Sequence, residues 1–179
     1  DELPSNFADF LIGHVAAKVA QKTEQTIWTG ATANAGEFNG FGALLAADAG
    51  VVDVTGTSVT AANVITEMGK VVDAIPSAVY GKDDLYLYVS SNVARAYVRA
   101  LGGFGASGLG ANGVQNNGTT WFNGQDLAFD GVKLFVASGM ADNTMVAAQK
   151  SNLFFGTGLL SDHNEVKLLD MADLDGSKN

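Results

Sequence analysis

The order of hydrophobic patterns along the chain constrains its fold more than any other sequence feature. From Ser5, apolar residues recur at intervals of three and four, which predicts a helix reaching about Gln25. Helical spacing returns from Thr60 and stops at Pro76, because proline cannot continue a helix. Short runs of strand type dominate the remainder. Helices gathered early and strands gathered late favour an α+β fold over an alternating parallel sheet.

The opening helix is predicted to be amphipathic and to pack along a sheet. The face expected to be buried carries four apolar side chains at intervals of four residues: Phe7, Leu11, Val15 and Val19. On or beside this face lies His14, which we expect to be packed and hydrogen-bonded rather than a ligand or a base. The glycine-rich segment 28–42 must then turn repeatedly, and residues 43–47 add a short helical turn.

Strand signals follow in the later sequence. Residues 51–54 are a short strand candidate, and Leu85–Val89 is an apolar and aromatic run of strand type. Ser90 or Ser91 can cap the next helix, which ends before Gly102. Further short strands are separated by Asn-Gly, Asp-Gly and other turns: 119–122, 127–129, 132–136, 144–148, 153–155 and 166–169. The second half is therefore predicted to be mostly antiparallel sheet.

Composition excludes several classes of protein. With 179 residues, of which 47% are hydrophobic, the chain can form one compact domain or two small lobes. It has no run near the roughly 18 apolar residues of a membrane span, so we expect a soluble protein. The lack of cysteine excludes disulfides and thiolate sites. A net charge of -9 has the wrong sign for a nucleic-acid binder.

Two overlapping G-x-G-x-x-G matches, at 103–108 and 108–113, superficially suggest dinucleotide binding. In the dinucleotide fingerprint a strand enters the glycine turn and a helix leaves it, whereas here a helix enters and a polar loop leaves. Segment 102–118 is instead predicted to be a long exposed loop that binds no phosphate. We expect it to be mobile in an isolated chain, because ordering glycine-rich backbone has a large entropic cost.

The remaining polar candidates also favour simple interpretations. His163 belongs to a solvated turn, and Asn117 matches a glycosylation pattern short enough to arise by chance. Asp170, Asp173 and Asp175 lack the spacing of a calcium loop and are predicted to form a solvated tail. No pattern combines a nucleophile, a base and an oxyanion donor. We therefore predict no catalytic, cofactor-binding or metal-binding residue, and no enzyme.

Five segments resemble a known family, the tailed-bacteriophage major capsid proteins of the Hong Kong 97-like fold. In that family a long spine helix runs into an acidic residue, a glycine turn and a glycine-rich segment ending in a leucine pair; a strand and helix, a Gly-x-Val turn and a Phe-Gly segment follow. The corresponding segments here are Glu24-Gln-Thr-Ile-Trp-Thr-Gly30, Gly36-Glu-Phe-Asn-Gly40 through Leu45, Leu85–Val89 with the helix from Asn92, Phe129-Asp-Gly-Val-Lys-Leu-Phe135, and Leu153-Phe-Phe-Gly156.

The resemblance implies a structural coat protein that forms pentameric and hexameric capsomers of an icosahedral phage head, with virion localisation after assembly in the bacterial cytoplasm. It implies no cofactor, no membrane and no specific nucleic-acid binding. Residues 1–55 would be the peripheral-domain helix and glycine loop, 56–150 the axial domain, and 151–179 the return to the peripheral domain. The family's N-terminal arm, extended loop and last strand have no counterpart here, so we expect a trimmed chain.

Three alternatives remain open at this point. An encapsulin-like nanocompartment shell shares the capsid fold. An adhesin or tail-fibre-like binding module would suit the abundance of Gly, Ala, Asn and Thr in the second half, although the long opening helix argues against it. The third alternative is an enzyme of unrecognised type.

Overall fold

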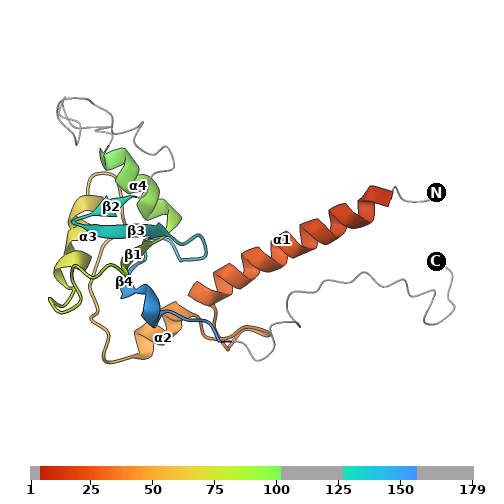
Figure 1. Ribbon diagram of the computed structural model, residues 1–179, viewed down its shortest axis with the longest axis horizontal. Helices are drawn as coiled ribbons and strands as arrows, with labels where there is room; N and C mark the ends of the chain where they lie inside the picture. The colour runs from red at the N-terminus through yellow and green to blue at the C-terminus, as the bar shows by residue number, and fades with distance from the viewer. Residues whose placement is uncertain (1–4, 102–126, 157–179) are drawn as a thin grey trace. The chain divides into compact units, whose positions relative to one another are not determined.

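The computed structural model describes residues 5–101 and 127–156, and these combine helices with one sheet (Figure 1). In chain order the elements are α1 (Ser5–Thr29), α2 (Phe41–Ala47), α3 (Val64–Asp73), β1 (Leu85–Val89), α4 (Ser91–Leu101), β2 (Ala128–Phe129), β3 (Val132–Val136), β4 (Met145–Gln149) and the short 3-10 helix η1 (Lys150–Asn152). The predicted α+β class is confirmed. The chain divides into two units, 1–24 with 155–179 and 25–154.

The unit formed by 25–154 is built on a four-stranded sheet with the strand order β2-β3-β1-β4. Strand β1 pairs with β4 in antiparallel fashion and with β3 in parallel fashion, and β2 with β3 forms an antiparallel hairpin. The sheet is therefore mixed: two of its three strand pairs are antiparallel, as expected of a mostly antiparallel sheet, and the β1–β3 pair is parallel. Helix α4 lies between these two strands in sequence and belongs to the crossover that a parallel pair requires.

Side chains along each strand point alternately to the two faces of the sheet, so the core has two layers. Leu85, Leu87 and Val89 of β1 point to one face, which is the period of two expected of a strand buried on that side. Helices α3 and α4 cover this face with apolar side chains, of which Met68 and Val93 are fully buried. The apolar spacing that predicted both helices therefore describes the surfaces by which they pack.

The opposite face of the sheet is covered by the last turn of α1 and by α2. Trp28 is buried, and its ring lies 5.3 Å from that of Phe41 and 5.5 Å from that of Tyr88. Gly30 and Gly40 bring the intervening loop together, since Gly40 N–H donates to the Gly30 carbonyl at 2.9 Å. A Cβ at either glycine would lie 2.5 Å from a backbone oxygen, which explains the glycine-rich sequence after α1.

Helix α1 is present as predicted and extends to Thr29, but the apolar side chains that were predicted to be buried are exposed among the described residues. Phe7, Val15 and Val19 are 41%, 38% and 47% exposed. The final turn of α1, around Trp28, packs on the sheet. The periodicity shows which helix face is apolar, but it does not identify the surface that covers that face.

Two predicted strands are also wrong. Residues 51–54 and 153–155 form no strand, because neither segment pairs with a neighbouring strand among the described residues. Apolar β-branched or aromatic composition favours extended backbone but supplies no ladder of hydrogen bonds. The strand candidates 119–122 and 166–169 lie outside the described residues.

Candidate functional site

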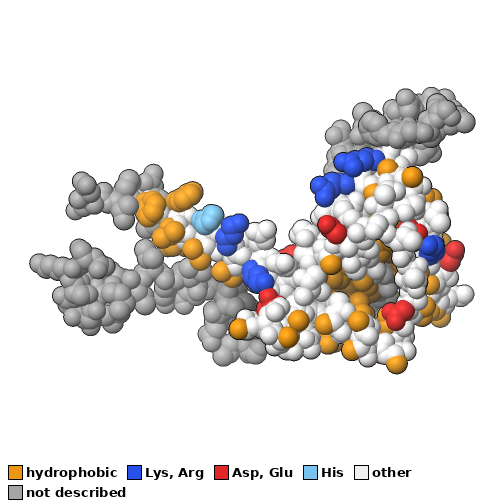
Figure 2. Space-filling model, turned by 180° about the vertical axis from the view of Figure 1, so that it is seen from behind, with side chains coloured by type: hydrophobic (Ala, Val, Ile, Leu, Met, Phe, Trp, Pro, Cys, Tyr) orange, Lys and Arg blue, Asp and Glu red, His pale blue; other side chains and the backbone are white. Residues whose placement is uncertain are grey.

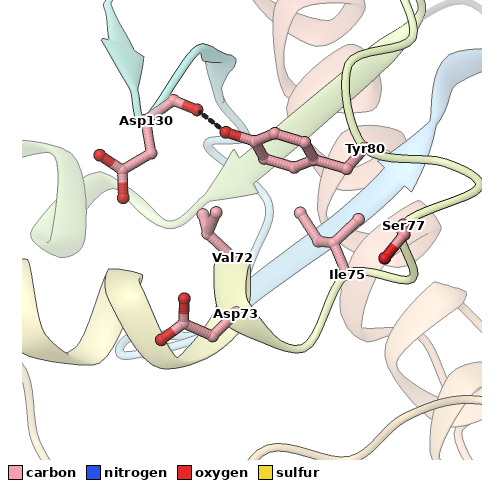
Figure 3. Close-up of a pocket in the computed structure, with 6 residues that line it drawn as sticks. All are labelled: Val72, Asp73, Ile75, Ser77, Tyr80 and Asp130. Carbon is pink, nitrogen blue, oxygen red and sulfur yellow. Dashed lines mark hydrogen bonds between the residues drawn. The ribbon is translucent and has the colours of Figure 1, made fainter.

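An open hollow of about 430 Å³ lies beside the C-terminal end of α3 in the unit formed by 25–154. Its wall combines apolar, hydroxyl and carboxylate side chains from α3, the following loop and the turn between β2 and β3 (Figure 3): Val72, Asp73, Ile75, Ser77, Tyr80 and Asp130. We refer to it as the α3 hollow. It brings together segments that are far apart in sequence.

One hydrogen bond joins the two halves of the α3 hollow. The Tyr80 hydroxyl donates to the backbone carbonyl of Asp130 at 2.7 Å. Asp130 and Gly131 have positive φ angles of 46° and 78° and form the tight turn predicted from the Asp-Gly pair. This turn presents the Asp130 side chain and the carbonyl that fixes Tyr80. In Figure 3 the Asp73 and Asp130 carboxylates lie toward one end of the hollow and the Tyr80 ring toward the other.

The α3 hollow suits a cationic group. Its lining carries two carboxylates and no basic side chain, and neither Asp73 nor Asp130 has a salt-bridge partner among the described residues. The exposed ring of Tyr80 adds an aromatic face that attracts cations. The sequence did not predict that Tyr80 and Asp130 lie together, although the Asp-Gly signal correctly placed Asp130 in a turn.

A second, smaller hollow of about 160 Å³ also has Tyr80 in its wall. Its wall includes two lysines, Lys82 and Lys133, and one acidic side chain, Asp83. The charge therefore changes from negative to mainly positive between the two hollows. A basic group would be attracted to the α3 hollow and repelled by its neighbour.

Positive charge is presented by the outer face of α4. Arg95 and Arg99 are exposed, and their spacing of four residues puts them on one side of the helix. The Arg95 Nε donates to the Ser91 carbonyl at 3.2 Å, whereas neither guanidinium has an acidic partner among residues 5–101 and 127–156. The buried side of the same helix holds Val93 and Tyr97.

Exposed apolar side chains form a second surface feature, on α1. Phe7, Phe10, Val15 and Val19 are all more than one-third exposed, and Phe10 reaches 69%. Hydrophobic side chains are visible along this helix in Figure 2. An apolar helix face of this kind is typical of a surface that another chain covers.

A buried carboxylate within α3 has a structural role. Glu67 accepts hydrogen bonds from the Thr57 backbone N–H at 3.2 Å and the Thr57 hydroxyl at 3.0 Å, and pairs with Lys70 at 2.8 Å. The hydrogen bond from Lys70 is the main cause that lowers the pKa of Glu67, and the bonds from Thr57 lower it further against the opposing effect of burial. Glu67 thereby fastens the segment before α3 to the helix.

The polar residues considered from sequence do not converge on one site. His14 is exposed and its ring stacks against Phe10 at 6.3 Å, so the prediction of a packed histidine is wrong. Helix α1 has no neighbour covering that turn among the described residues of its own unit. The glycine motifs, Asn117, His163, Asp170, Asp173 and Asp175 lie outside the described residues.

Within residues 5–101 and 127–156, no three acidic, histidine or cysteine side chains come together in a way that could hold a metal ion. None of the helices described there has the length and apolar character needed to cross a membrane. Comparisons of the chain with protein-family models, with curated proteins and with solved structures found no match.

Proposed function

We propose that the chain is a structural subunit that packs against copies of itself, as the coat protein of a tailed-bacteriophage head of the Hong Kong 97-like type. The sequence resemblance described above motivates the family. The α+β architecture is compatible with it, since a long helix enters a glycine-rich turn and continues into a lobe containing a sheet and two helices. Homo-oligomeric capsomers and a place in the virion follow as parts of the same proposal.

The observation that carries the proposal is the exposed apolar face of α1. Aromatic and β-branched side chains such as Phe10 and Val19 gain free energy when they leave water, about 1.5 to 3 kcal/mol for each side chain that becomes fully buried. Among the described residues of one chain these side chains are exposed. Contact between copies would remove this apolar surface from water, which is the main driving force for association of proteins.

Electron microscopy of the full-length gene product, together with sedimentation velocity, tests the proposal directly. Closed shells or ring-shaped capsomers are expected. A product that stays monomeric at every concentration, with no particle by microscopy, would contradict it. Shells that enclose an enzyme in place of DNA would assign the chain to the encapsulin-like alternative.

A matched pair of substitutions on α1 tests the role of the apolar face. Val15→Glu places a charge on that face, whereas Ala20→Glu places the same charge five residues further along, about 140° around the helix. Both positions are exposed and glutamate is a good helix former, so neither change should unfold the helix. We expect Val15→Glu alone to reduce assembly, and equal assembly by both variants would contradict a contact through this face.

A further inference from the structure

The α3 hollow has the chemistry of a site for a guanidinium group. Its apolar wall, formed by Val72 and Ile75, suits the methylene stem of a long side chain, and the Tyr80 ring offers a flat surface for stacking. The Asp73 and Asp130 carboxylates can accept hydrogen bonds from a planar fork of donors. Arginine fits this combination better than lysine, because lysine carries a compact charge that neither stacks nor binds in bidentate fashion.

The position of Asp73 provides a separate argument. Asp73 is the last residue of α3, where the partial negative charge of the helix end disfavours a carboxylate. No cation within the described residues pairs with it. An incoming positive charge would relieve the repulsion between this carboxylate and the helix end.

The same chain carries the complementary group. Arg95 and Arg99 project from α4 without an acidic partner in the described part of the chain, and they do not reach Asp73 or Asp130 of their own copy. Within one copy, no ion pair among the described residues joins α4 to the α3 hollow. A second copy can place its arginines in the hollow while its own hollow stays open for a third.

We propose that the α3 hollow of one subunit receives Arg99, with Arg95 beside it, from α4 of a neighbouring subunit. This contact is head-to-tail, so copies related by a rotation that divides a full turn evenly form a closed ring, as a capsomer requires. The inference rests on the proposed function, because it specifies the contact by which the copies associate. It also assigns the occupant of the hollow as a second copy of this chain.

A charge exchange tests the contact. Asp73→Arg and Arg99→Glu each put like charges opposite one another, so each variant alone should associate at least about tenfold more weakly than the parent protein in sedimentation velocity. In an equimolar mixture the arginine introduced at position 73 of one variant faces the glutamate introduced at position 99 of the other, and the unchanged Arg99 faces the unchanged Asp73. Mixing should therefore restore association.

The control is Lys82→Glu, which makes a charge reversal of the same size as Arg99→Glu in the neighbouring hollow and should not weaken association. Circular dichroism of each variant checks that the fold is retained. If the parent protein assembles and both single variants assemble equally well, or if mixing restores nothing, the arginine contact is wrong and the proposed function stands. A parent protein that never associates overturns both.

Discussion

Asn92 and Asn143 hold each other through two hydrogen bonds although they are far apart in sequence. The Asn92 side-chain Nδ2 donates to Asn143 Oδ1, and the Asn143 backbone N–H donates to Asn92 Oδ1, both at 3.0 Å. Asn143 Oδ1 also accepts from the Val59 backbone N–H at 2.8 Å. The pair thus joins the start of α4, the turn before β4 and the segment before α3.

Replacing Asn143 should separate the contribution of its side-chain hydrogen bonds to stability from that of its backbone conformation. Its φ of 62° lies in the left-handed region, which glycine adopts freely and alanine does not. We expect Asn143→Ala to lower the free energy of unfolding by about 1 to 2 kcal/mol, through lost hydrogen bonds and backbone strain. Asn143→Gly should cost less, since it loses only the hydrogen bonds. Urea denaturation measures both, and equal losses would show that the backbone conformation contributes nothing.

Trp28 should be a principal determinant of stability, because it joins the last turn of α1 to the sheet. Trp28→Ala removes a ring that is only 7% exposed, and we expect a loss of about 3 to 5 kcal/mol. Trp28→Phe keeps an aromatic contact with Tyr88 and should cost clearly less. Thermal denaturation followed by far-ultraviolet circular dichroism gives the comparison. A near-neutral Trp28→Ala would mean that α1 ends without packing on the sheet.

The Asp130-Gly131 turn predicts different effects on stability for substitutions at its two residues. Gly131 has a φ of 78°, so Gly131→Ala should destabilise the protein by about 1 to 2 kcal/mol. The cost is one of backbone conformation, because a Cβ there would approach nothing closer than the Tyr80 hydroxyl at 4.0 Å. Asp130→Asn keeps a residue that tolerates positive φ and should be nearly neutral. A neutral Gly131→Ala, measured by urea denaturation, would contradict the turn geometry.

Glu67 should make stability depend on pH in the acidic range. Its pKa is lowered in the folded protein from an ordinary value of 4.5, chiefly by the hydrogen bond from Lys70. Its stabilising contribution is therefore complete above pH 4.5 and is lost as the pH falls through the folded-state pKa. Glu67→Gln should be less stable than the parent protein at neutral pH, and the difference should shrink as the pH falls through the folded-state pKa of Glu67.

Asp53→Asn is the control for the loss of one negative charge, because it removes the same charge from an exposed side chain. At neutral pH it should lower the free energy of unfolding less than Glu67→Gln does. Denaturation midpoints in urea across the acid range provide the measurement. A Glu67→Gln difference that stays constant down to low pH would show that the carboxylate is not held in its charged form.

Local patterns predicted the elements whose partners lie nearby in sequence or that bury one clear face. The helix ending before Pro76, the strand Leu85–Val89 and the Asp130-Gly131 hairpin are of this kind, because spacing, composition and turn residues agree at each. The short helix Phe41–Ala47 was likewise predicted within two residues at its start.

Long-range pairing could not be predicted in the same way. The parallel direction of the β1–β3 pair depends on which strand edges meet after the crossover, and apolar runs carry no information on direction. Residues 51–54 have the composition of a strand, but they form none because no neighbouring strand pairs with them among the described residues. The α3 hollow and the Asn92–Asn143 pair are also formed by segments that are distant in sequence. Of their residues, only Asp130 was placed from the sequence, because it belongs to the predicted Asp-Gly turn.

The strand order also has a consequence for synthesis of the protein on the ribosome. Strand β1 is the first strand to emerge, yet both of its neighbours, β3 and β4, come from the last part of the lobe. Until Gln149 has left the exit tunnel, at least one edge of this apolar strand has no native partner. Exposed strand edges invite pairing with other nascent chains. Chains that terminate before β4 should therefore aggregate, whereas chains that reach η1 can close the sheet.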